Sequence, residues 1–151
     1  MTNRKKVVIV GPAFPLRGGI ANFNEALSRE MNLKGYETEL VSFSYQYPKF
    51  LFPGKTQFAE GKGPEDLTIF TRINAVSPLN WMKTAKFIAT LKPDYVIIRF
   101  WLPFMGPALG TIAGKLLKKG VKVLAITDNV IPHESRLGDR WLTKYFLKRC
   151  D

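Results

Sequence analysis

The chain has 151 residues, of which 46% are hydrophobic, and a formal net charge of +11. This length fits one ordinary domain, and the hydrophobic content argues against disorder. Cys150 is the only cysteine, which excludes an intrachain disulfide and favours a reducing, cytoplasmic setting. The longest apolar stretch, residues 100–114, is interrupted by two prolines and is shorter than the ~20 residues of a membrane-spanning helix.

The first predicted strand, Lys6–Val10, is followed by a loop that ends in Gly18-Gly19 and opens a helix over residues 19–34. The first-turn N–H groups of a helix lack intrahelical partners, and the helix dipole favours an anion. Arg17, Gly18 and Gly19 are therefore candidates for holding a phosphate. A tight connection between strand and helix explains the glycines about equally well. The helix is expected to face the core through Ile20, Phe23, Leu27 and Met31.

The rest of the chain alternates strands and helices. Further strands are predicted over Glu37–Phe43, Leu67–Ile73, Asp94–Phe100 and Val121–Thr127. Helices are predicted over residues 79–92, 107–119 and 138–149. Strands that each return through a helix predict an α/β fold with a doubly wound, mostly parallel sheet and helices on both faces. The irregular stretch Tyr45–Asp66 is a candidate for substrate selectivity, because loops of this length are commonly functional.

In open parallel sheets, ligands bind beyond the carboxyl ends of the strands. Residues that directly follow the predicted strands should therefore converge: Arg17 to Gly19, Phe43 to Tyr47, Arg99 to Trp101, and Asp128 to Glu134. The last of these segments contains His133, the only histidine. A histidine beside a carboxylate suits proton transfer or hydrogen bonding to a substrate hydroxyl. A structural role, in which His133 orients the following turn, is slightly favoured.

Several familiar nucleotide and hydrolase motifs are absent. The dinucleotide fingerprint needs an acidic residue at the end of the second strand, where this chain has Ser42-Phe43-Ser44. The triphosphate-binding loop fails because Leu16 occupies the position of its second glycine. No D-x-D pair and no G-x-S-x-G elbow occurs, so neither a metal clamp for a diphosphate nor a serine hydrolase is predicted. We expect no cofactor and no metal.

Two segments together resemble the retaining glycosyltransferases of family four, which have two Rossmann-like domains. The first is G-G-I-A-x-F-x-x-x-L, from Gly18 to Leu27, and the second is N-V-x-P-H-E, from Asn129 to Glu134. The resemblance covers the chain from Val7 to Cys150. It implies that residues 1–151 are the acceptor-side, N-terminal half of a GT-B fold. Because the sequence stops directly after a predicted helix, we expect a C-terminal donor-nucleotide domain beyond it.

The resemblance also implies the reaction and the roles of the site residues. A sugar would pass, with retention, from a nucleotide-sugar donor, which is a substrate, to an acceptor. The donor phosphate or sugar would contact Arg17, Gly18 and Gly19; catalysis would involve His133 and Asp128; and the acceptor would contact Arg99, Asn129 and Glu134. The family often has a histidine directly before the asparagine, and here that position is Asp128.

Two other functions stay open. One is a non-catalytic nucleotide- or phosphate-binding α/β module with a basic surface. The other, weaker alternative is a surface module for nucleic acid or membrane, since the net charge favours acidic partners. No nucleic-acid motif accompanies the scattered cations, so nucleic acid is not expected. Two predicted helices have a basic outer face that would suit an anionic membrane at the cytoplasmic side, although a solvated face is the commoner explanation. These faces are formed by Lys83, Lys86, Phe87 and Thr90 on one helix and by Arg140, Lys144 and Lys148 on the other.

Overall fold

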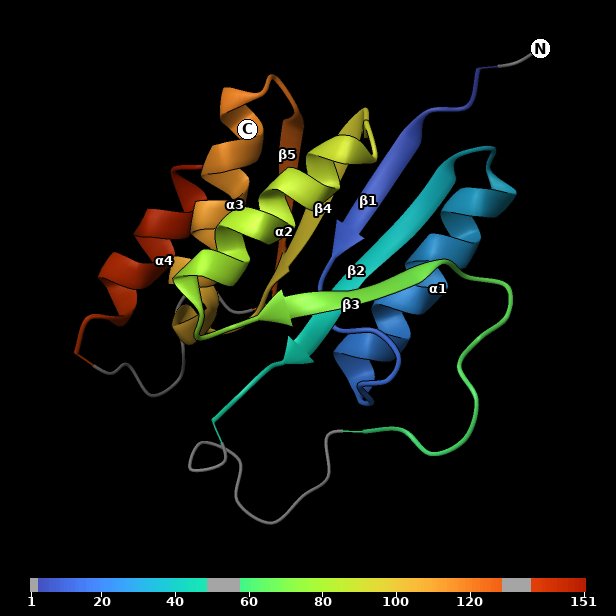
Figure 1. Cartoon of the computed structure of the whole chain (residues 1–151), viewed down its shortest axis with the longest axis horizontal. Coiled ribbons are helices and arrows are strands. Elements are labelled where there is room, and N and C mark those ends of the chain that lie inside the picture. Colours follow the sequence, from blue (N-terminus) through green and yellow to red (C-terminus); the bar gives the residue numbers. More distant parts are fainter. Residues whose placement is uncertain (1–2, 49–57, 129–136) are drawn as a thin grey trace.

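A five-stranded parallel sheet forms the centre of the computed structural model, which describes residues 3–48, 58–128 and 137–151 (Figure 1). Its strands are β1 (Lys6–Val10), β2 (Glu37–Tyr45), β3 (Ile69–Asn74), β4 (Tyr95–Phe100) and β5 (Lys122–Thr127). They lie in the order β3-β2-β1-β4-β5, and every neighbouring pair is parallel. From β1 the chain adds β2 and β3 on one side, and it then adds β4 and β5 on the other side of β1. The carboxyl ends of β1 and β4 therefore form the topological switch point of the sheet.

Helices cover both faces of this sheet, so the predicted doubly wound α/β fold is confirmed. The helices are α1 (Gly19–Leu33), α2 (Pro78–Thr90), α3 (Gly106–Lys118), α4 (Asp139–Leu147) and the short 3-10 helix η2 (Pro103–Met105). Helices α2, α3 and α4 pack beside one another on one face, and α1 packs on the other (Figure 1). Sequence analysis placed every element except η2. No helix in the described ranges combines the length and apolar character needed to cross a membrane.

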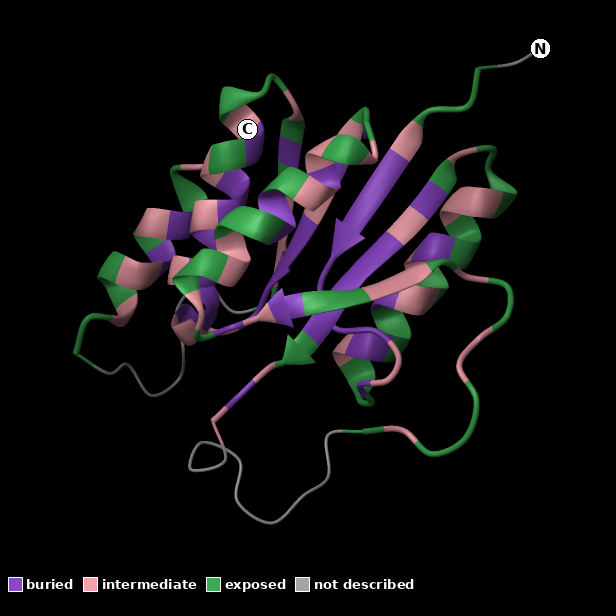
Figure 2. Ribbon diagram, viewed as in Figure 1, coloured by how far each residue is buried: buried purple, intermediate pink, exposed green. Residues whose placement is uncertain are grey.

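Alternate residues of the central strands serve two hydrophobic cores. Val8 and Val10 of β1 face the larger core beneath α2, α3 and α4. Val7 and Ile9 face the smaller core, which Leu27 and other α1 side chains cover. Figure 2 shows the resulting burial, which runs along β1 and most of β2 and leaves the outer helix surfaces exposed. Burial on both faces of the sheet explains the unbroken hydrophobic run from Val7 to Val10 in β1.

The predicted apolar stripe of α1 is partly wrong. Phe23 is 47% exposed instead of facing the core. The buried side chains of α1 are Ala21, Asn24 and Ser28, two of which are polar. Burial of these polar groups is tolerated because each makes hydrogen bonds: the Asn24 amide donates to the Pro12 carbonyl at 2.8 Å, and Ser28 pairs with a buried threonine hydroxyl.

The outer face of α2 differs from its prediction at one residue. Lys83 and Lys86 are exposed as predicted. Phe87 is instead partly buried, and its ring lies edge-on to Phe70, with ring centroids 5.0 Å apart. The reason is that α2 also packs beside the edge strand β3, which covers part of the face turned away from α3.

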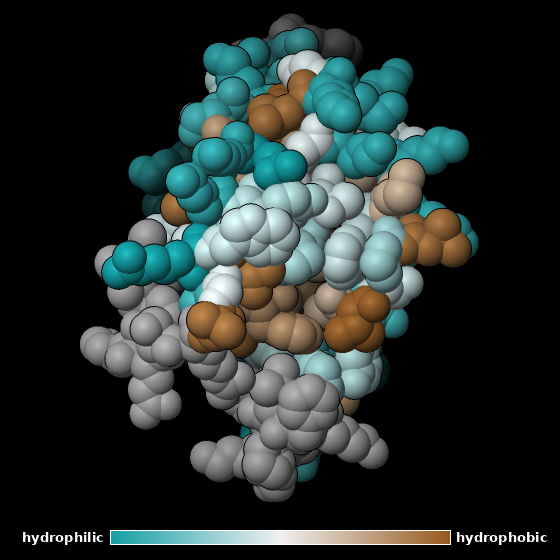
Figure 3. Space-filling model, turned by 90° about the vertical axis from the view of Figure 1, so that its left-hand side faces the viewer, coloured by the Kyte–Doolittle hydropathy of each residue, from teal (hydrophilic) through white to brown (hydrophobic). Residues whose placement is uncertain are grey.

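Large hydrophobic side chains remain exposed at the beginnings of α2 and α4. Among them are Leu79 and Met82 on α2, and Trp141 on α4. On the side of the molecule drawn in Figure 3, hydrophobic side chains gather mainly in the lower half, and the surface above them is mostly hydrophilic. Arg140 and Lys144 on α4 and Lys148 directly after it are exposed as predicted, so this helix carries exposed cations as well as the exposed Trp141.

Glycines spaced by four residues bring α3 close to α4. A Cβ on Gly106 would lie 2.5 Å from the Leu142 carbonyl oxygen, and one on Gly110 would lie 2.6 Å from the Tyr145 ring. The third glycine, Gly114, faces only the flexible side chain of Arg149, with the nearest atom at 3.2 Å. Close packing of the two helices therefore depends on the first two glycines.

We expect Gly106→Ala to lower the free energy of unfolding by about 1–3 kcal/mol, because the added methyl group meets backbone that cannot move aside. Urea unfolding followed by circular dichroism measures this. Gly114→Ala is the control, and it should be neutral or stabilise the protein by up to about 1 kcal/mol through helix propensity. Equal effects of the two substitutions would contradict this account of the α3–α4 contact.

Candidate functional site at the switch point

The glycine loop, which we define as residues 11–19, follows β1, ends at the first residue of α1 and is held by side chains from two neighbouring elements. From β2, the Ser42 hydroxyl accepts a hydrogen bond from the Ala13 N–H and donates one to the Ala13 carbonyl, both at 3.0 Å. From α1, the Asn24 amide donates to the Pro12 carbonyl. These bonds fix the path of the loop from the sheet to the beginning of α1.

The two glycines at the end of this loop have different roles in the backbone. Gly18 has a φ angle of 129°, a conformation that side-chain-bearing residues rarely adopt. Gly19 begins α1, and a Cβ there would meet no atom of the described chain within 4 Å. Among the described residues, no side chain caps this helix, and its first turn carries no acid. The first-turn N–H groups are therefore open to an anion, and Arg17 lies exposed beside them.

A bidentate ion pair joins the ends of β4 and β5. The Arg99 Nε atom donates to Asp128 Oδ2 at 2.6 Å, and Arg99 Nη2 donates to Asp128 Oδ1. The Arg99 side chain is only 8% exposed and that of Asp128 28%. The Asp128 N–H also donates to the Phe100 carbonyl at 3.0 Å, which anchors the residue directly after β5. Both carboxylate oxygens of Asp128 are thus engaged by the same guanidinium.

The Phe23 side chain of α1 and the backbone of Gly11, directly after β1, both pack against Arg99. The Phe23 ring lies over the guanidinium, with Arg99 Cζ 4.2 Å from the ring centroid. Gly11 permits the close approach, because a Cβ there would lie 2.9 Å from Arg99 Cβ and 2.8 Å from Asn24 Nδ2. Within the described ranges, two buried atoms here have no hydrogen-bond partner, namely Arg99 Nη1 and Asn24 Oδ1. One is a donor and the other an acceptor, the combination that a hydroxyl group satisfies.

The loops after β2 and β4 also meet. Trp101 Nε1 donates to the hydroxyl of Tyr47, and both side chains are buried. Phe43 packs edge-on against the Trp101 ring at a centroid distance of 5.8 Å. Burial raises the pKa of the Tyr47 phenol above its usual value, so this hydroxyl keeps its proton at neutral pH. The contact fixes the beginning of the irregular stretch that follows β2.

Cys150 does not contribute a nucleophile. Its thiol is partly buried beside the carbonyl of Phe146, and burial raises its pKa to about 11. At neutral pH the thiol is therefore protonated, whereas nucleophilic attack and metal binding need the thiolate. No three histidine, cysteine, aspartate or glutamate side chains come together as a possible metal site in the part of the chain that the structure describes.

The structure thus brings part of the predicted site together. Arg99 and Asp128, predicted to contact the acceptor and to act in catalysis, form one ion pair. The loop after β1 meets the end of β4 where Gly11 packs against Arg99. His133, Asn129 and Glu134 lie outside the described residues, so their positions stay predictions.

Sequence analysis missed Phe23 and Asn24 as members of this cluster. The available signal was a polar residue, Asn24, three places before Leu27 on a helix expected to face a hydrophobic core. Its polarity becomes intelligible once the loop after β1 is known to lie against it. Phe23 gave no such signal, because an aromatic residue in that stripe is the ordinary choice for a core.

Comparisons with solved structures reveal the fold. The chain is similar to MurG of Acinetobacter baumannii, with a TM-score of 0.54, 16% identity and coverage of 93% of this chain. It is also similar to a putative UDP-N-acetylglucosamine 2-epimerase of Listeria monocytogenes, with a TM-score of 0.56, 12% identity and coverage of 99%. The chain has the Rossmann-like fold of a GT-B domain. It spans 39% of the length of each of these two proteins.

At these identities the likeness concerns the fold alone. No family model and no curated protein matches the sequence. The match nevertheless extends over nearly the whole of this chain, including the strands that flank the switch point.

We expect Asp128→Asn to lower the free energy of unfolding by about 1–3 kcal/mol, because it leaves the buried guanidinium of Arg99 without its counter-charge. Chemical denaturation measures the effect. The double variant Arg99→Met/Asp128→Asn should be destabilised by less than the sum of its two single variants, since both residues serve one interaction.

The exposed ion pair between Arg29 and Asp66 offers a matched control. Asp66→Asn should leave stability nearly unchanged, because water screens an exposed pair. Strict additivity of the Arg99 and Asp128 substitutions would show that the pair carries no coupling energy.

Proposed function

We propose that this chain is the acceptor-side domain of a glycosyltransferase that uses a nucleotide-sugar donor. The observation that carries the proposal is the polar cluster at the switch point of a GT-B-like fold, where a buried donor on Arg99 and a buried acceptor on Asn24 lack partners among the described residues. A sugar has many hydroxyl groups, each of which can donate and accept, and so suits such a site. Transfer with retention rests on the sequence resemblance.

The proposed roles combine the sequence resemblance with the geometry of the described residues. The open first turn of α1, with Gly18, Gly19 and Arg17, would face the donor phosphate or sugar. Arg99 would contact the acceptor, together with Asn129 and Glu134 from the segment after β5. Because Arg99 occupies both oxygens of Asp128, the proposed part of Asp128 in catalysis is to hold that guanidinium in place. Proton transfer would then fall to His133.

A non-catalytic phosphate-binding module is the second candidate. The uncapped first turn of α1 favours it, because this feature binds anions whether or not chemistry follows. The two functions differ in what the complete gene encodes. A second α/β domain with paired glutamates about eight residues apart would favour the transferase, and a gene that ends after Asp151 would favour the module.

Gly19→Val in the complete gene product should reduce sugar-nucleotide turnover by about 100-fold, because the side chain obstructs the backbone donors that would stabilise the diphosphate. Fold stability should change little, since a Cβ at this position meets no atom of the described residues within 4 Å. Release of nucleoside diphosphate from a panel of nucleotide sugars measures turnover.

Ala26→Val is the control for this substitution, because it adds a branched side chain to an exposed position on the same helix. Its turnover should match that of the parent protein. Unchanged turnover in a folded Gly19→Val protein would remove the glycine loop from the donor site.

The 151-residue chain by itself should catalyse no glycosyl transfer. Transfer needs donor and acceptor held together in reactive geometry, and this positioning supplies much of the rate enhancement. In the proposed architecture, the groups that hold the nucleotide base and ribose belong to another domain. The assay compares the 151-residue chain with the complete gene product on the same donors, and genuine transfer by the shorter chain would refute the two-domain proposal.

A further inference from the structure

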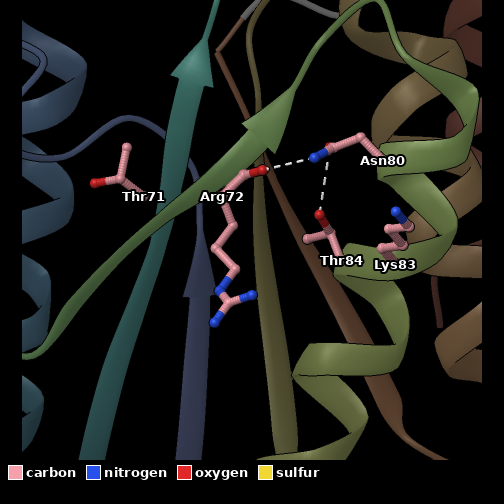
Figure 4. A pocket seen from close by; sticks show the side chains of 5 residues that line it. All are labelled: Thr71, Arg72, Asn80, Lys83 and Thr84. Atoms are coloured by element: carbon pink, nitrogen blue, oxygen red, sulfur yellow. Dashed lines mark hydrogen bonds between the residues drawn. The ribbon is translucent and has the colours of Figure 1, made fainter.

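A pocket of about 270 Å³ opens between the edge strand β3 and α2, away from the switch point. It is lined by Thr71, Arg72, Asn80, Lys83 and Thr84 (Figure 4). No acidic residue occurs in the sequence between Asp66 and Asp94, a segment that contains both β3 and α2. The same segment carries Arg72, Lys83, Lys86 and Lys92, so the two elements that form the pocket contribute cations and no acid.

A β-bulge places Arg72 at this pocket. In the pairing of β2 with β3, Ser42 lies opposite Thr71 and Phe43 opposite Ile73, which leaves Arg72 as the extra residue. Bulges of this kind redirect side chains and are frequent at sheet edges. The Asn80 amide of α2 donates to the Arg72 carbonyl at 2.8 Å and so ties the bulge to the helix.

The guanidinium of Arg72 is oriented without the use of its N–H donors. It lies over the Phe87 ring, with Cζ 3.8 Å from the centroid, and that ring is itself packed against Phe70. In the ranges that the structure describes, neither Arg72 nor Lys83 forms an ion pair with a carboxylate. Two cations at one pocket therefore lack a counter-charge, and their donors are available to a ligand.

Polar groups of α2 complete the lining. Asn80 Oδ1 accepts from the Asn74 N–H at 2.8 Å and from the Thr84 hydroxyl at 3.4 Å, which fixes the orientation of the amide. In Figure 4, Asn80 and Thr84 lie between the two cations, and Thr71 lies on the far side of the strand. The amide uses one of its two N–H groups on Arg72, so the second can still donate.

We propose that this pocket binds a phosphate ester through Arg72 and Lys83. A guanidinium presents a planar fork of donors that matches phosphate oxygens, and an ammonium group adds a second positive charge. The proposal is independent of the transferase function, because β2 separates β3 from the strand that leads into the glycine loop.

The phosphate could belong to a soluble ester or to a lipid headgroup, which present the same chemistry. Exposed apolar side chains lie beside the cations on α2 and before it: Val76, Leu79 and Met82, which are 49%, 64% and 49% exposed. Apolar groups next to cations suit the boundary between headgroups and acyl chains. A soluble ester has no need of them, so the two sources predict different dependence on a bilayer.

The test uses the 151-residue chain and two probes. Glycerol 3-phosphate is titrated by ¹⁵N NMR, with the side-chain signals of Asn80 and Arg72 as local reporters. Co-sedimentation is measured with vesicles of phosphatidylcholine, with and without phosphatidic acid. The double variant Arg72→Gln/Lys83→Gln should weaken binding to the effective probe by at least about tenfold, because it removes charge-assisted hydrogen bonds.

The matched control is Lys86→Gln/Lys92→Gln, which removes the same charge from the same segment at residues outside the pocket lining. It should retain most of the binding. Lys83→Gln alone keeps the contact between Arg72 and Phe87, so it tests the pocket if the double variant is poorly folded; it should weaken binding by several-fold.

Binding of glycerol 3-phosphate that depends on Arg72 and Lys83 would support a soluble ester as ligand. Dependence seen only with phosphatidic acid vesicles would support a lipid headgroup. Absence of binding to both probes would overturn the proposal. So would equal losses in the two double variants, since these would show a general effect of charge rather than a site.

Discussion

The ion pair between Arg99 and Asp128 is the interaction on which the carboxyl edge of the sheet depends. It links the end of β4, the strand that pairs with β1, to the end of β5. It also places a nearly buried cation directly beside the loop after β1. Burial of a charge is unfavourable unless a partner compensates for it, so Asp128 has to stay where it is. Asp128 also directly precedes the segment that carries the predicted site residues Asn129, His133 and Glu134. The need to neutralise Arg99 thus fixes the end of β5, the start of the loop that follows it, and the side chain that packs against Gly11.

The fold could be predicted from the sequence because its signals are local. Strands such as Lys6–Val10 carry an unbroken hydrophobic run, and most are followed by a stretch with helical periodicity, which together indicate a parallel sheet between helices. The stripe of α1 misled the prediction because the same helix has to serve two neighbours, the sheet and the loop after β1. Asn24 satisfies the loop and is buried, while Phe23 turns out towards Arg99. Periodicity records how often apolar residues recur, and it carries no information about which neighbour a residue meets.

The candidate site was predictable only as a set of strand ends. Arg99 and Asp128 were each singled out by position, yet their pairing depends on the register of β4 with β5, in which Arg99 lies opposite Ile126, two residues before Asp128. The bulge at Arg72 could not be predicted for the same reason, because it is defined by the register of β2 with β3. Register is set by pairing between strands that are distant in sequence, so the residue pattern of a single strand does not reveal it.

The unpartnered atoms at the switch point connect stability with function. A buried donor or acceptor without a partner costs about 1–3 kcal/mol, and here Arg99 Nη1 and Asn24 Oδ1 both lack protein partners within the described ranges. Each residue already performs a structural task with its other atoms, since Asn24 Nδ2 holds the glycine loop and Arg99 Nε holds Asp128. An apolar residue could not perform either task, so the structure retains both side chains together with their unsatisfied atoms. Water or a ligand hydroxyl relieves this cost, and a ligand that does so gains affinity from groups that the fold has already fixed in place. The requirements of the fold thereby supply a preorganised polar site at the position where a doubly wound sheet presents its ligands.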